Sequence, residues 1–111
     1  MDIRLRDLGQ HKILEIYGDV DLYNVGELKK AIFDLIEKEE VKSLVIDLKA
    51  VPYMDSSGIG ALVAGQKKMK LRGGKFALMH LQDDVFTMLK LATLDRFFTI
   101  YESETQLQGV A

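Results

Sequence analysis

The sequence predicts a single α/β domain with a mostly parallel sheet and one antiparallel edge strand. Short apolar runs, which are typical of buried strands, alternate along the chain with amphipathic helical patterns. The first two strand-like segments follow each other directly across Gly9 and Gln10, as in a hairpin. The chain has 111 residues, well below the roughly 250 at which a single core divides. The expected order is therefore ββαβαβαβα, within one domain that spans residues 1–111.

The N-terminal residues are expected to form a β-hairpin. Charged and apolar side chains alternate loosely over residues 3–8, which is typical of an edge strand with one exposed face. Gly9 and Gln10 supply a turn, and the apolar residues between 13 and 17 supply the second strand. Since so short a connection joins antiparallel neighbours, this pair forms the antiparallel edge of the sheet.

The first helix is predicted to begin at Asn24, after a loop over residues 18–23. Asn24 followed three residues later by Glu27 resembles a capping box, in which side chains satisfy the unpaired amides of the first helical turn. Apolar residues then recur at helical spacings and form one face of an amphipathic helix: Val25, Leu28, Ile32, Leu35 and Ile36. Residues 37–40 are its solvated end.

The rest of the chain alternates strands and helices. The run SLVIDL is almost continuously apolar, as expected of a parallel strand that is covered on both faces. The expected elements are, in order, this strand over 43–48, a loop over 49–55 stiffened by Pro52, a helix over 56–72 ended by Gly73 and Gly74, a strand over 76–79, a helix after Asp83 and Asp84, a strand over 97–101 and a short helix over 102–108.

The composition excludes several classes of function. A net charge of −2 argues against bulk electrostatic binding of nucleic acid, and the basic run at 67–72 is interpreted as a solvated helix face. The chain has no cysteine, which removes thiolate metal sites and thiol catalysis, and no metal or cofactor is expected. No apolar run reaches the roughly 20 residues of a membrane span, and the N-terminus lacks a signal-peptide pattern. We therefore expect a soluble, cytoplasmic chain without a membrane partner.

The junction between the 43–48 strand and the next helix is the strongest candidate for a site. In parallel sheets, ligands and partners bind at the carboxyl ends of the strands, where this junction lies. Asp55 is suited to the N-cap position, with Ser56 and Ser57 in the first helical turn. Gly58 and Gly60 keep that turn slim, so that another backbone could approach it. The residues alone leave two interpretations open, a capped helix packed closely on the sheet or a phosphorylatable switch.

The other candidate residues give less support to a functional site. His11 and His80 are isolated, and His80 is interpreted as a structural residue. A hydrolase that used Ser56 as its nucleophile would need one of these histidines beside it. Asp47 superficially resembles the phospho-accepting aspartate of a response-regulator receiver domain. The acidic pair after the first strand and the lysine at the end of the last strand are absent, so we reject that class.

The sequence resembles the anti-sigma factor antagonists of the STAS domain family (sulfate transporter and anti-sigma factor antagonist) over almost its whole length. The specific block is DSSGIG at residues 55–60, which resembles the family signature of Asp, a serine or threonine, a small residue, Gly, an apolar residue and Gly. Three weaker blocks support it in order and spacing: GDVD at 18–21, the glycine pair at 73–74 and the segment 89–100.

The resemblance implies a protein switch and no enzymatic activity. The unmodified antagonist binds an anti-sigma factor with serine kinase activity and so frees the sigma factor for transcription. The kinase phosphorylates Ser56, with Ser57 as the weaker candidate, and a PP2C-type phosphatase restores the active form. The expected partner-binding residues are Asp19, Asp21, Asn24, Asp55, Ser56, Ser57 and Gly58.

Two further roles of the same fold stay open. The chain could be the STAS partner subunit of a lipid-transport ATPase or a scaffold component of a stress-signalling complex. In the antagonist role, a phosphate adds about −1.5 to −2 charges beside Asp55. We expect that charge to abolish binding with little change in the fold.

Overall fold

Five strands form one mixed sheet in the computed structural model of this chain, which describes residues 1–109. The strands lie in sequence order, with β1 antiparallel to β2 and every other neighbouring pair parallel. Their bounds are β1 Asp2–Leu8, β2 His11–Tyr17, β3 Ser43–Ala50, β4 Lys75–Met79 and β5 Thr99–Tyr101. The predicted mostly parallel sheet with an antiparallel edge strand is confirmed, and so is the predicted order of elements.

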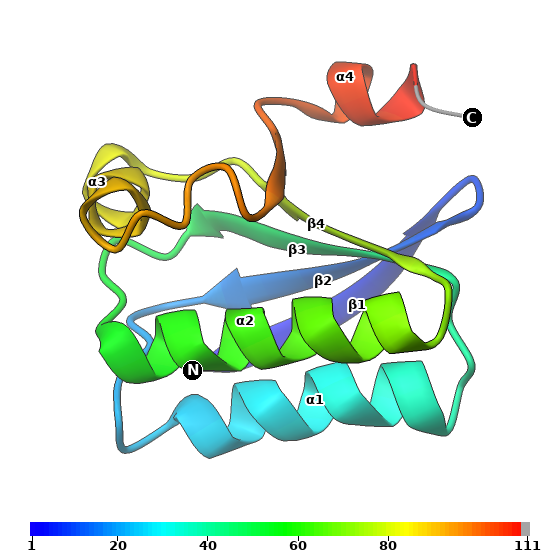
Figure 1. Cartoon of the computed structure of the whole chain (residues 1–111), viewed down its shortest axis with the longest axis horizontal. Coiled ribbons are helices and arrows are strands. Elements are labelled where there is room, and N and C mark those ends of the chain that lie inside the picture. Colours follow the sequence, from blue (N-terminus) through cyan, green and yellow to red (C-terminus); the bar gives the residue numbers. More distant parts are fainter. Residues whose placement is uncertain (110–111) are drawn as a thin grey trace.

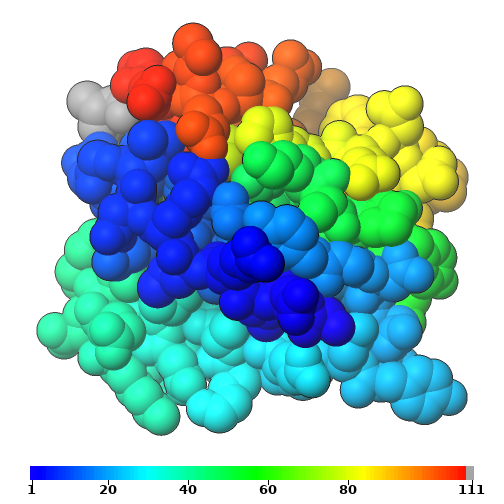
Figure 2. All heavy atoms as spheres, turned by 180° about the vertical axis from the view of Figure 1, so that it is seen from behind, coloured from blue at the N-terminus to red at the C-terminus, as the bar shows by residue number. Residues whose placement is uncertain are grey.

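The helices cover the two faces of the sheet unequally (Figure 1). Their bounds are α1 Val25–Glu37, α2 Ser56–Leu71, α3 Asp83–Leu91 and α4 Glu104–Gln108. The long helices α1 and α2 lie side by side against one face, and α3 lies beside the carboxyl ends of the strands. The short α4 lies over the opposite face, close to β1, as the space-filling view from behind also shows (Figure 2).

Alternation along β3 divides its side chains between two apolar clusters. Leu44, Ile46 and Leu48 belong to the main core beneath α1 and α2. Val45 belongs to a smaller cluster on the other face, which Leu107 of α4 completes. Because successive strand residues point to opposite faces, a strand covered on both sides is apolar throughout. Residues 43–48 are all buried, which confirms the interpretation of this run.

The last strand is shorter than predicted. The apolar pattern favoured a strand over 97–101, whereas β5 comprises only Thr99–Tyr101. The amide of Phe97 donates to the carbonyl oxygen of Leu94 in a turn, and the Phe97 ring packs edge-on against buried Phe98. Phe98 belongs to the main core from the bend before β5, whereas Phe97 is 37% exposed, and apolar character alone does not separate that arrangement from a strand.

The capping box predicted at the first helix is wrong. Asn24 occupies the N-cap position of α1 but its side chain makes no capping hydrogen bond. Its Oδ1 instead accepts a hydrogen bond from the amide of Asp21 at 2.9 Å, and its Nδ2 donates to the carbonyl oxygen of Asp19 at 2.9 Å. The side chain therefore closes the preceding loop and leaves the first turn of the helix uncapped.

Candidate functional site

Two loops that are distant in sequence meet at the carboxyl edge of the sheet. The segment after β3 runs parallel to the segment after β2, through a bridge between Val20 and Met54. The amide of Val20 donates a hydrogen bond to the carbonyl oxygen of Tyr53 at 3.0 Å. The amide of Asp55 donates one to the carbonyl oxygen of Val20 at 3.0 Å. This pairing brings the 19–24 loop beside the start of α2, and so unites the two segments that the sequence singled out.

Asp55 caps α2 and ties the two loops together. Its backbone is extended (φ −87°, ψ −177°), and its Oδ1 accepts hydrogen bonds from the amides of Ser57 at 2.9 Å and Gly58 at 3.3 Å. Its Oδ2 accepts one from the amide of Leu22 at 3.0 Å. The hydrogen bond from the Ser57 hydroxyl, supported by these amides, lowers the pKa of Asp55 below its ordinary value. The predicted N-cap is confirmed, and the tie to Leu22 comes from the tertiary structure.

The two serines of the first turn differ in their surroundings. The Ser57 hydroxyl donates to Asp55 Oδ1, and the residue is half-buried. Ser56 is exposed, and its hydroxyl has no hydrogen-bond partner among residues 1–109. A group can therefore be added to Ser56 Oγ without breaking any of these hydrogen bonds, whereas modification of Ser57 Oγ would remove the hydrogen bond that its hydroxyl donates to Asp55.

Asp21 organises the neighbouring loop. Its Oδ1 accepts hydrogen bonds from the amides of Tyr23 at 2.9 Å and Asn24 at 3.1 Å. Asp19 is exposed, and the chain has no lysine or arginine between residues 50 and 66. This corner of the molecule is therefore acidic in both of its segments.

Gly58 is buried, and its own core occupies the space beside it. A Cβ atom there would lie 2.4 Å from Met54 Cγ and 2.9 Å from Val20 Cγ1. The close approach expected at Gly58 is thus made within the chain and not by an outside backbone. Gly60 differs, because it is exposed and a Cβ would meet nothing within 4 Å.

Large apolar side chains are exposed in the two loops that meet at the start of α2, and the sequence patterns did not single them out. Tyr23 is 95% exposed, Leu22 70% and Tyr53 50%. A mainly apolar cavity of about 270 Å³ lies next to Tyr53, between the segment before α2 and the Asp84–Met88 side of α3. Large apolar residues in loops that connect strands to helices could have indicated this surface from the sequence, because such loops are ordinarily polar. Exposed aromatic side chains are enriched at protein interfaces.

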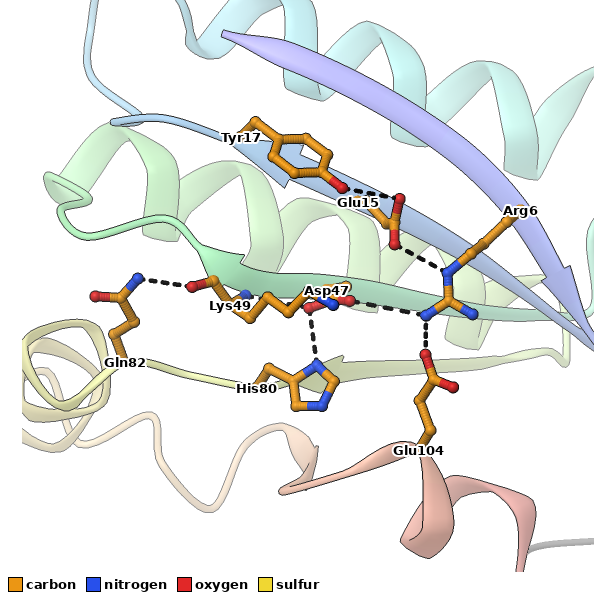
Figure 3. Close-up of polar contacts among 8 residues, drawn as sticks. All are labelled: Arg6, Glu15, Tyr17, Asp47, Lys49, His80, Gln82 and Glu104. Carbon is orange, nitrogen blue, oxygen red and sulfur yellow. Dashed lines mark hydrogen bonds and ion pairs between the residues drawn. The ribbon is translucent and has the colours of Figure 1, made fainter.

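The geometry gives no support to the alternative chemistries. The Nδ1 atom of His80 lies 3.0 Å from Asp47 Oδ1 (Figure 3). The Nδ1 atom of His11 lies 2.6 Å from Ser43 Oγ, so neither histidine is paired with Ser56. Asp47 is 1% exposed, which closes it to phosphate transfer. In the part of the chain that the structure describes, no cluster of His, Asp and Glu side chains could hold a metal ion. None of the described helices is long and apolar enough to cross a bilayer.

The fold and this corner define a class of protein, a small α/β domain that exposes one serine at a capped helix start among carboxylates and apolar side chains. The family model described as "STAS domain" matches residues 2–107. The chain therefore belongs to the STAS domain family.

Individual relatives agree with this assignment. The chain is 29% identical to the anti-sigma-B factor antagonist of Listeria monocytogenes over 109 residues, which cover 98% of this chain and 94% of that protein. Its structure is similar to that of protein TM1081 of Thermotoga maritima, with a TM-score of 0.89 and 25% identity, over 96% of this chain and 92% of the other. Phosphorylated SpoIIAA of Bacillus shares the fold, with a TM-score of 0.76 and 16% identity over 99% and 100% of the two chains.

Proposed function

We propose that this chain is an anti-sigma factor antagonist that acts by binding and not by catalysis, in the cytoplasm. The observation that carries the proposal is the environment of Ser56, which is exposed and without a partner while Asp55 and Ser57 hold the helix start. The name of the Listeria relative, which aligns with nearly the whole chain, supports the same function.

In this proposal the unmodified corner binds an anti-sigma factor. The binding residues are those expected from the sequence, Asp19, Asp21, Asn24, Asp55, Ser56, Ser57 and Gly58. We add the exposed Leu22, Tyr23 and Tyr53, which supply the apolar contact area that carboxylates lack. Gly58 contributes indirectly, because its missing side chain lets α2 pack against Val20 and Met54.

Phosphorylation of Ser56 would switch binding off. The anti-sigma factor, acting as a serine kinase, transfers the γ-phosphoryl group of ATP to Ser56 Oγ. ADP is released, and the kinase accepts the proton of the serine hydroxyl. The added charge of about −1.5 to −2 lies beside Asp55. A unit like-charge pair at 4 Å costs about 1 kcal/mol in water and about 4 kcal/mol at an effective dielectric of 20. The free protein keeps the phosphate in water, whereas a docked partner would have to bury it.

A PP2C-type phosphatase would reverse the switch by hydrolysing the phosphoserine. Because Ser56 is exposed and outside the capping hydrogen bonds, a phosphatase can reach it in the folded protein. The fold is then the same in both states, and only the charge of the docking surface changes.

The test is phosphorylation by the cognate anti-sigma factor with ATP, followed by intact-protein mass spectrometry. We expect one phosphate on the wild type and on Ser57→Ala, and none on Ser56→Ala. Full phosphorylation of Ser56→Ala would overturn the assignment. A pull-down that returns a lipid-transport ATPase in place of a kinase would favour the alternative role of partner subunit.

A further inference from the structure

A second cavity opens at the carboxyl ends of β4 and β5, apart from the Ser56 corner. It measures about 590 Å³ and lies between α3 and the segment that leads from β5 to α4. Cavities that hold small ligands measure about 300–1,000 Å³, and the carboxyl ends of parallel strands are their usual place in α/β sheets. None of the residues that line it belongs to the proposed Ser56 surface.

The charged groups of the lining are all carboxylates. Asp83 from the start of α3, Asp95 from the turn after α3 and Glu102 directly after β5 border the cavity. No lysine or arginine is among the described residues that line it. Carboxylates only accept hydrogen bonds, so these three groups favour a ligand that donates them.

His80 extends this set of acceptors. It lines the cavity just after β4, and its Nδ1 lies 3.0 Å from Oδ1 of Asp47, which is 1% exposed. When the ring is neutral and Nδ1 donates to this buried carboxylate, Nε2 is left as an acceptor. Figure 3 shows that Nε2 points away from Asp47.

The remaining walls are apolar and aromatic. Phe86 and Tyr101 contribute rings, and the Nζ atom of Lys90 lies 5.0 Å from the centroid of the Phe86 ring. The faces of aromatic rings attract cations within about 6 Å. Phe86 therefore already takes an ammonium group from the chain itself, although Lys90 does not line the cavity.

We propose that this cavity binds an organic cation with several N–H donors, that is, a guanidinium or a primary ammonium group. Carboxylates and an imidazole acceptor match its donors and charge, and the aromatic walls match its alkyl stem. The cation is either free or carried by an arginine or lysine side chain of a partner protein.

The first test is titration of the full chain with agmatine at low salt, followed by ¹H–¹⁵N correlation spectra. We expect saturable shifts at the amides of His80 and Glu102, and weaker binding as salt rises. N-butylurea, which is similar in shape but uncharged, should leave these amides unchanged. Equal shifts with both compounds, or no saturable shift with agmatine, would overturn the proposal.

Two kinds of variant, expected to change the affinity for agmatine in opposite directions, extend the test. We expect Asp95→Asn combined with Glu102→Gln to weaken agmatine binding at least fivefold. Lys90→Gln should strengthen it, because it removes a competing cation from the Phe86 ring. Asp84→Asn is the matched control, since Asp84 lies on the same helix but lines the cavity beside Tyr53. Unchanged affinity in the double variant would contradict the proposal.

A blocked tripeptide with arginine at its centre distinguishes the two sources of the cation. Binding as tight as that of agmatine indicates a partner's side chain, and exclusion of the peptide while agmatine binds indicates a free cation. Failure of both probes overturns the proposal. No kinase takes part in these measurements, so their outcome is independent of the phosphorylation of Ser56.

Discussion

The Asp55 carboxylate accepts a hydrogen bond from the backbone amide of Leu22 at 3.0 Å, across 33 positions of sequence. Its other oxygen caps α2 through the amides of Ser57 and Gly58. One side chain thus holds the loop after β2 against the helix that presents Ser56. The loop that carries the exposed Leu22 and Tyr23 is therefore held next to the start of α2.

Asp55 is expected to make the stability of the fold depend on acid pH. Its hydrogen bonds, that of the Ser57 hydroxyl first, lower its pKa in the folded chain. A lowered pKa stabilises the fold above the ordinary value of about 3.9, and that contribution is lost as the pH falls through the folded value. In urea denaturation between pH 6 and pH 3, the wild type should lose more stability than Asp55→Asn, which cannot titrate. Parallel pH profiles would contradict this prediction.

Gly58→Ala and Gly60→Ala should have opposite effects on stability. The new methyl group at Gly58 would overlap Met54 and Val20, and overpacking of this kind costs about 1–3 kcal/mol. At Gly60 the methyl group meets nothing within 4 Å, and alanine favours an α-helix over glycine by about 0.5–1 kcal/mol. Urea denaturation of both variants measures the difference. A stabilised Gly58→Ala variant would show that the contacts around Gly58 are wrong.

Leu22→Ala and Tyr23→Ala should weaken binding of the cognate anti-sigma factor without destabilising the chain. Both side chains are largely exposed, so little folding energy depends on them. Apolar anchors at the centre of an interface contribute about 1–3 kcal/mol to binding. Leu71→Ala is the control, because Leu71 is 88% exposed at the far end of α2. Calorimetry should give an unchanged affinity for that control, and an equal loss in all three variants would remove Leu22 and Tyr23 from the surface.

Ser56→Glu should preserve the fold and weaken the complex. The side chain enters water beside Asp55, and it leaves the capping hydrogen bonds intact. We expect at least a tenfold loss of affinity for the anti-sigma factor with an unchanged circular dichroism spectrum. Gln108→Glu adds the same charge at an exposed position of α4 and should bind normally. If both variants bind equally well, the position of the charge does not matter and the switch model fails.

Asp47→Ala should be more destabilising than Asp47→Asn. Asp47 lies on the sheet face that α4 covers, where its Oδ1 accepts a hydrogen bond from His80 Nδ1 (Figure 3). Its Oδ2 lies 3.9 Å from Arg6 Nη2. Alanine leaves His80 Nδ1 and the amide of Lys49 without the Asp47 oxygen that accepts from them, and an unsatisfied buried partner costs about 1–3 kcal/mol. Asparagine keeps an oxygen that can accept from His80. Thermal denaturation that ranks the two variants in the reverse order would contradict the role of this contact.

Local sequence patterns predicted most elements but not every cap or end. Asp55 and Asn24 are both residues that favour N-caps, yet only Asp55 caps its helix. The loop after β2 closes on the Asn24 side chain, which is then unavailable to α1. The strand expected over 97–101 is shorter for a related reason. The amide of Phe97 closes a turn with Leu94, and its ring packs against Phe98, so neither residue joins the sheet. In both cases contacts with residues at most five positions away decided between two local structures that both suit the residues.

The sequence by itself determined the fold class, the hairpin edge and the helix start that carries Asp55, Ser56 and Ser57. These features follow from hydrophobic periodicity and capping preferences, which act over a few residues. Only the tertiary structure decided which of the two serines is free and that Leu22 lies beside them. It also decided that the space at Gly58 is filled from within. These outcomes depend on where backbone amides and side chains from different strands and loops meet, and spacing along the chain does not specify such contacts.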